Sequence, residues 1–130
     1  MSKPHFILFN VTNELVEDAY TILGIASKTG RIIKGASKSL DAVGKRKVKL
    51  VVIAEDARTS EAISHLPYLC ADTKTPVTYV PSKKTLGKKY GDGCNITAVC
   101  ITDLGEASDL YNFLFLPKLE KIKEERSIKY

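Results

Sequence analysis

The sequence predicts an α/β fold, a three-layer α-β-α sandwich in which helices cover both faces of a sheet. Segments typical of strands alternate with segments typical of amphipathic helices. Two strand-like runs, Val48–Ala54 and Thr97–Asp103, are almost wholly apolar, as is typical of strands buried on both faces. The chain has 130 residues, 44% of them apolar, which suits one domain with a real core. We therefore expect a single domain across residues 1–130.

The first elements follow from the spacing of apolar residues. We expect residues 1–11 to form a mobile or edge segment, and a helix to run from about Thr12 to Ser27. Acidic residues lie near the start of this helix, where they complement its dipole. Gly30 then leads into a short strand. The predicted inner stripe of the helix is Leu15, Ala19, Ile22 and Ala26.

The stretch Arg31–Gly44 combines that strand, a sharp turn at Gly35 and a short amphipathic helix. A helix N-terminus carries partial positive charge and unpaired N–H groups, so this turn suits a phosphate group. The helix has one face predicted to be buried and one polar face outside the core. The predicted buried face is Ala36, Leu40 and Val43, and the polar face is Ser37, Lys38 and Asp41.

A helix and a strand are expected between residues 55 and 80. Thr59 or Ser60 is the expected N-cap of the helix. Pro67 is expected to break the helix, with a separate turn continuing to Asp72. The strand Pro76–Val80 follows.

The last two predicted helices flank the strand Thr97–Asp103. Ser82 is expected to cap a helix that runs through Lys89. The final helix is expected to begin near Glu106 and to be kinked or restarted at Pro117. Its expected inward-facing residues are Leu110, Phe113, Leu114, Leu119 and Ile122.

Basic residues are concentrated in one part of the chain. The formal net charge is +5, and eight basic residues but only one acid, Asp41, lie between Lys28 and Lys49. A second basic cluster lies between Lys83 and Lys89. Solvated surface charge is the usual explanation for such residues. Two clusters beside a helix-opening turn nevertheless favour a nucleic-acid partner.

Several other classes of function are not favoured. Three cysteines without a CxxC pair and two distant histidines predict no metal site, and no cofactor motif is present. We expect Cys70 and Cys100 to be reduced core residues of a cytoplasmic protein that does not enter a membrane. His65 is expected to be a packed or capping residue. Glu55 and Asp56 are expected to accept hydrogen bonds from loop N–H groups rather than to act in catalysis.

Four motifs, taken together and in order, resemble the kink-turn-binding ribosomal protein family of the L-seven-Ae type. They are Gly35-Ala36 at a helix start, the strand Lys49–Asp56, the run His65–Cys70, and Val80–Lys83 followed by Leu86-Gly87. The resemblance covers about residues 12–122. It implies a four-stranded mixed sheet and binding to kink-turns, which are sharply bent RNA helices. It further implies a role in the large ribosomal subunit, a guide-RNA particle or ribonuclease P, beside other ribonucleoprotein proteins and without catalysis.

The RNA-contacting positions that the resemblance implies differ here from the family pattern. That pattern has Asn, Glu and Lys where this chain has Ser37, Lys38 and Asp41. One hypothesis is that Asp41 accepts hydrogen bonds from a guanine while Lys38 donates to guanine or phosphate. The alternative is a surface ion pair between Lys38 and Asp41 with no role in recognition.

The remaining candidate contacts lie on both sides of the helix and in the loop before the last strand. Lys34 and Lys45 are expected to neutralise phosphates. The loop differs from the family pattern, and Asn95 or Ile96 either covers an extruded base or belongs to a plain loop. The full set of predicted RNA-binding residues is Lys34, Gly35, Ser37, Lys38, Asp41, Lys45, Cys94, Asn95 and Ile96.

Two functions of different class therefore remain open. The first is an RNA-binding structural subunit of a ribonucleoprotein, monomeric when free. The second is a divergent member that no longer recognises kink-turns and acts through protein contacts. Its docking face would be the acidic stretch 55–72, with Ile63 and Leu66. An enzyme is not expected, since the chain has no room for a second, catalytic domain beside this one.

Overall fold

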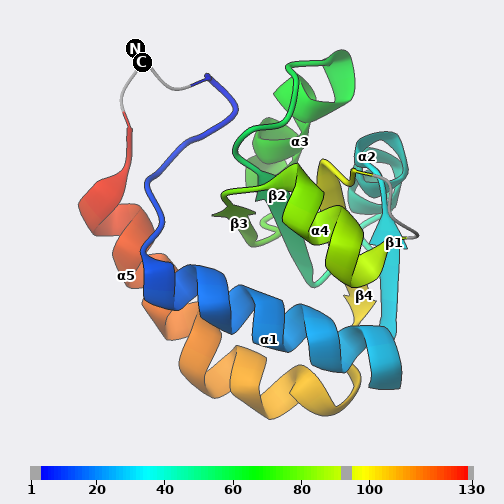
Figure 1. Ribbon diagram of the computed structural model, residues 1–130. Helices are drawn as coiled ribbons and strands as arrows, with labels where there is room; N and C mark the ends of the chain where they lie inside the picture. Colours follow the sequence, from blue (N-terminus) through cyan, green and yellow to red (C-terminus); the bar gives the residue numbers. More distant parts are fainter. Residues whose placement is uncertain (1–3, 92–94, 129–130) are drawn as a thin grey trace.

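The computed structural model describes residues 4–91 and 95–128. Helices and strands alternate along the chain as the sequence predicts (Figure 1). In chain order the elements are α1 (Asn13–Thr29), β1 (Arg31–Lys34), α2 (Ala36–Gly44), β2 (Leu50–Ala54), α3 (Glu61–Asp72), β3 (Val77–Val80), α4 (Lys83–Tyr90), β4 (Ala98–Asp103), the 3₁₀ turn η1 (Gly105–Ala107), the π-helical segment η2 (Leu110–Phe115) and α5 (Leu116–Arg126).

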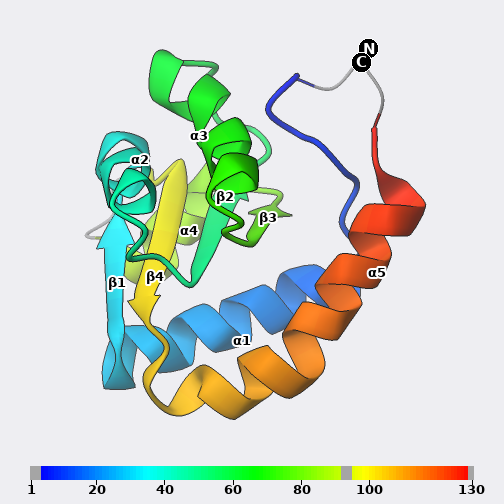
Figure 2. The same cartoon turned by 180° about the vertical axis from the view of Figure 1, so that it is seen from behind.

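The strands form one mixed sheet in the order β1-β4-β2-β3. Strands β2 and β3 run parallel, whereas β4 is antiparallel to both of its neighbours, β1 and β2. Helices α2 and α3 pack together on one face of the sheet, and α1 and α4 lie on the other (Figures 1 and 2). This arrangement confirms the predicted three-layer sandwich around a four-stranded mixed sheet.

The core lies along the two central strands. Every residue of β2 is buried, as expected for a strand that helices cover on both faces. Cys70 of α3 and Cys100 of β4 are free, buried thiols, which confirms their prediction as core residues. Burial, and to a lesser degree Cys100, raises the pKa of the Cys70 thiol to about 12, so Cys70 stays protonated at neutral pH.

Three helices begin at capping side chains, and the sequence analysis names the caps of two of them. The hydroxyl oxygens of Thr12, Ser60 and Ser82 accept hydrogen bonds from the N–H group three residues further on, at 3.2, 3.2 and 3.1 Å. Ser60, not Thr59, is therefore the cap of α3. Each cap satisfies one N–H group that the helix leaves unpaired, which stabilises the chain by about 1 kcal/mol.

The prediction that Pro67 breaks α3 is wrong. The helix runs without interruption to Asp72 and contains Pro67 in its interior. Proline removes only one helical N–H donor, and the ring of Pro67 is buried against the core. The remaining hydrogen bonds and this packing keep the helix intact.

No helix among the described residues is long and apolar enough to cross a membrane.

The predicted inward face of the last helix is also partly wrong. Phe113 and Leu114 are 75% and 54% exposed, while Tyr111 and Phe115 are buried. The reason is η2, whose wider π-helical turns shift the side chains out of the 3.6-residue period. Pro117 lies in the first turn of α5, so a new helix does start there, as predicted.

The N-terminal segment packs into the core, contrary to expectation, over the part that the structure describes. Phe6, Ile7 and Phe9 are each only 2% exposed. The hydroxyl of Tyr79 in β3 donates to the Phe6 carbonyl at 2.6 Å and accepts from the N–H of Leu8 at 3.1 Å. A bridge between Phe9 and Ser127 joins this segment to the end of α5. Apolar side chains six to nine residues into the chain thus extend the core.

Candidate nucleic-acid interface

Gly35 joins β1 to α2 in a backbone conformation that favours glycine, with φ 109° and ψ 144°. Its N–H donates to the Ala98 carbonyl at 2.8 Å, and its carbonyl accepts from the N–H of Ser39 at 3.0 Å. A Cβ at this position would meet no atom of the described residues within 4 Å. The turn therefore ties the start of α2 to β4, and its outer side is open space as far as the described residues are concerned.

Helix α2 exposes the polar face that the sequence predicts. Ser37, Lys38 and Asp41 are all exposed. The buried face differs from the prediction, because the buried residues are Ser39, Ala42 and Val43, whereas Ala36 and Leu40 are only half-buried. The helix is thus rotated so that the small side chains Ser39 and Ala42 face the core, and α2 lies close against the sheet and α3.

The first turn of α2 has properties that suit an anion. Among the described residues, no side chain caps the N-terminus at Gly35, and the first turn contains no acidic residue. The N–H groups at the start of a helix have no intrahelical acceptor and carry the positive end of the helix dipole. These donors are therefore available to a phosphate at the open side of the turn.

An ion pair on the outer face of α2 differs from the Lys38–Asp41 pair that the sequence analysis considers as one of two alternatives. Lys45 Nζ lies 3.1 Å from Asp41 Oδ2, and the two side chains are 61% and 69% exposed. Lys38, the partner of Asp41 in that alternative, makes no ion pair with any residue in the described ranges, and the same holds for Lys34. Such an exposed pair contributes at most about 1 kcal/mol, so a ligand can compete for Asp41 or Lys45 at low cost.

A shallow groove of about 520 Å³ runs beside α2. Ile33 of β1 and Thr102 of β4 form its floor, and charged side chains of α2 and of the segment after it surround them. The groove residues are Ile33, Ser37, Lys38, Asp41, Ala42, Lys45, Lys47 and Thr102. Four of the nine predicted site residues thus line one surface. The groove has three cations and one acid along its rim.

The basic cluster from Lys28 to Lys49 is fully on the surface. All eight lysines and arginines in it are exposed. Arg46 has φ 57° and follows the end of α2, where cations complement the negative end of the helix dipole. Because these side chains are exposed, the cluster is accessible to a polyanion.

The loop before β4 lies at the same end of the sheet as the α2 turn, because Gly35 is hydrogen-bonded to Ala98. Asn95 is exposed, whereas Ile96 is only 8% exposed and belongs to the core. The Ile96 side chain is therefore not placed to cover a base in this conformation. Cys94, the remaining predicted residue of the loop, lies outside the described residues.

The start of α4 joins this end of the sheet, which the sequence alone does not reveal. The N–H of Ile96 donates to the Lys83 carbonyl at 3.2 Å, and the N–H of Lys83 donates to Asp56 Oδ1 at 2.8 Å. Asp56 thus accepts from a loop N–H group, as predicted. Lys84, beside Lys83, is exposed. The second basic cluster marks this region in the sequence, but it does not place the start of α4 beside the loop before β4.

Two other predicted candidates behave differently. His65 is exposed, so the expectation of a packed or capping histidine is wrong. Ile63 and Leu66 are 1% and 0% exposed, so their side chains do not form the docking face considered for the acidic stretch. Within the described ranges, no three His, Cys, Asp or Glu side chains are grouped so that they would hold a metal ion.

Comparison with known proteins identifies the family to which this fold belongs. The model of the ribosomal protein L7Ae/L30e/S12e/Gadd45 family matches residues 17–111, which is most of the chain. The chain belongs to this family. Among solved structures it is similar to the 15.5kD RNA binding protein of Giardia lamblia, with 25% identity and a TM-score of 0.67. That match covers 95% of this chain and 96% of the Giardia protein.

Membership of the L7Ae/L30e/S12e/Gadd45 family confirms the resemblance drawn from the four sequence motifs. The matched region contains the whole of β1, α2 and the loop before β4. Of the contact positions that the sequence resemblance predicts, Ser37, Lys38 and Asp41 are exposed on α2, and the half-buried Gly35 directly precedes this helix. Ser37, Lys38 and Asp41 are the three positions at which this chain differs from the pattern that the resemblance implies.

Proposed function

We propose that this protein is an RNA-binding structural subunit of a ribonucleoprotein and that it contacts RNA with the start of α2. The observation that carries the proposal is the open, uncapped helix start at Gly35 beside the exposed Lys34 and Lys38. Family membership and the similar Giardia RNA binding protein support it. The role is one of binding, not of catalysis.

We propose further that the preferred RNA is sharply bent, as a kink-turn is. A bend brings phosphates of two helical arms close together, which matches cations on both ends of the short helix α2. Lys34 and Lys38 would contact one arm, and Lys45 and Lys47 the other. Asn95, across the turn, would contact the bend itself. The particle would be a large ribosomal subunit, a guide-RNA particle or ribonuclease P, with RNA and ribonucleoprotein proteins as partners.

Asp41 is the residue on which recognition of a specific base would depend. A carboxylate accepts hydrogen bonds and a lysine only donates them, so Lys38 cannot replace the family's Glu as acceptor. The Asp41 carboxylate lies 3.1 Å from Lys45 Nζ, and both residues line the groove beside α2. Asp41 would thus accept from a guanine edge while Lys38 donates to guanine or phosphate. If Asp41→Ala leaves affinity for a kink-turn unchanged, this part of the proposal is wrong.

The test is a titration against a kink-turn RNA and a straight duplex of equal length, each at about 50 mM and about 200 mM salt. A preference for the kinked RNA that persists at the higher salt concentration supports the proposal. Equal and steeply salt-dependent binding to both RNAs contradicts kink-turn recognition.

A second candidate function is favoured by one observation, the altered residues at positions 37, 38 and 41. A divergent member that no longer recognises kink-turns would act through protein contacts. In that case the combined variant Ser37→Asn, Lys38→Glu and Asp41→Lys should create a preference for kinked RNA that the wild-type chain lacks. We propose a cytoplasmic location and a monomeric free state for either function, and the free thiols of Cys70 and Cys100 agree with a reducing compartment.

A further inference from the structure

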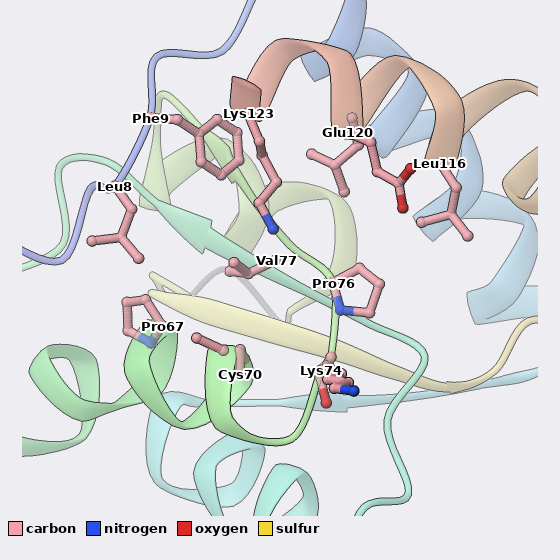
Figure 3. A pocket seen from close by; sticks show the side chains of 13 residues that line it. Leu8, Phe9, Pro67, Cys70, Lys74, Pro76, Val77, Leu116, Glu120 and Lys123 are labelled. Atoms are coloured by element: carbon pink, nitrogen blue, oxygen red, sulfur yellow. The ribbon is translucent and has the colours of Figure 1, made fainter. Parts of the chain in front are cut away.

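A cavity of about 390 Å³ lies at the edge of the molecule away from α2 (Figure 3). It is enclosed by the N-terminal segment, the end of α3 with the turn after it, and α5. Strand β3 beside it is one edge of the sheet, and β1 beside α2 is the other. Figures 1 and 2 both show α5 and α2 on opposite sides of the molecule. A ligand in this cavity and an RNA on α2 would therefore not collide.

The interior of the cavity is apolar. Phe9, Val77 and Leu119 are 2%, 4% and 1% exposed and form its inner wall, with Pro67 and Cys70 beside them. Such a wall offers few partners to the polar edges of a nucleobase, and burying those edges without hydrogen bonds is costly. It suits one or two bulky apolar side chains, for which the volume is adequate.

Two lysines give the cavity a positive rim. Figure 3 shows the Lys123 side chain reaching from α5 over Val77, with Lys74 at the opposite edge. Neither lysine forms an ion pair within residues 4–91 and 95–128. Glu120 also lines the cavity, but its carboxylate is turned away from the Lys123 nitrogen. The charge of Lys123 does act on the cavity wall, since it opposes, weakly, the burial that raises the pKa of Cys70.

We propose that this cavity is a docking site for a protein partner, whose contacting segment carries a bulky apolar side chain flanked by carboxylates. The apolar side chain fills the cavity, and the carboxylates pair with Lys74 and Lys123. The site is separate from the proposed RNA surface, so the chain would connect an RNA on one side with a protein on the other. Either proposal can fail without the other.

The first experiment selects random twelve-residue peptides on phage against the full-length chain. Counter-selection uses Ala71→Phe, because Ala71 is an exposed residue of α3 that lines the cavity and a phenylalanine there would fill it. Peptides that bind the wild-type chain and not the variant should combine a Leu, Ile, Phe or Trp with neighbouring Asp or Glu. Absence of such peptides, or enrichment of basic ones, overturns the proposal. If Ala71→Phe does not fold, Lys123→Glu serves for counter-selection.

The second experiment measures the affinity of one selected peptide, synthesised, for two matched variants. Lys123→Glu should weaken binding about fivefold, as expected for exposed charge pairs. Lys121→Glu makes the same charge change on the same helix but does not line the cavity, so it should change affinity less than twofold. Equal effects of the two variants would refute the role of Lys123. Displacement of the peptide by excess kink-turn RNA would show that the cavity belongs to an RNA site instead.

Discussion

Replacing Gly35 with alanine should destabilise the protein through the backbone alone. At φ 109° and ψ 144° an L-residue is strained by about 1–3 kcal/mol. The added Cβ would meet no described atom within 4 Å, so no clash contributes to this cost. At 2 kcal/mol the folded-to-unfolded ratio falls about 30-fold. The melting temperature should fall by roughly 3–5 °C per kcal/mol for a chain of this size.

Gly44→Ala is the matched control, because it makes the same chemical change at the other end of α2. Its Cβ would lie 4.0 Å from Leu69 Cδ2, an ordinary contact, and its φ is outside the left-handed range. Alanine should therefore stabilise the helix there by about 0.5–1 kcal/mol. Urea unfolding of both variants measures the two effects. If Gly35→Ala is as stable as the wild type, or both variants shift in the same direction, the description of the turn is wrong.

Three further predictions concern charge, hydrogen bonding and buried thiols. Lys34→Ala and Lys38→Ala should each weaken RNA binding and reduce the magnitude of the slope of log affinity against log salt by about 0.7–0.9. Lys121→Ala, on α5, should leave the slope unchanged. Unchanged slopes for Lys34→Ala and Lys38→Ala would exclude phosphate contacts at these two lysines. Tyr79→Phe should lower the free energy of unfolding by about 1–3 kcal/mol, because the Phe6 carbonyl and the Leu8 N–H lose their partner; calorimetry that finds no change contradicts this. Iodoacetamide at pH 8 should leave Cys70 and Cys100 unmodified in the native chain but alkylate them in urea, as peptide mass spectrometry would report. Native-state alkylation at pH 8 would count against the buried position. Folding raises the pKa of Cys70 from 9.0 to about 12, so the unfolded chain loses this proton at a lower pH than the folded chain. The free energy of unfolding should therefore fall as the pH rises from 9.0 to about 12.

Features with a local cause were predictable from the sequence. Caps such as Ser82 act over three residues, and the wholly apolar run at β2 can be satisfied only by burial on both faces. Gly35 was identified because a helix start after a short strand requires a sharp turn. The cations around it were visible as an excess of lysine and arginine.

Features that depend on packing between distant residues were not predictable. Pro67 stays in a helix because its ring packs in the core, and the π-helical segment rotates Phe113 to the surface without a sequence signal. Which face of α2 is buried depends on how closely Ser39 and Ala42 approach the sheet. Asp41 has two lysines at suitable spacing, and only the structure distinguishes Lys45 as its partner. The burial of Ile96 follows from its contact with α4, 13 residues earlier.

The most direct test of the central claim is amide NMR mapping of the full-length chain during addition of a kink-turn RNA. If the start of α2 binds the RNA, the amide chemical shifts of Gly35, Ser37 and Lys38 should change first and most, and those of α5 should stay unchanged. Movement confined to α5 or to the acidic stretch 55–72, with the α2 start unaffected, would contradict the account.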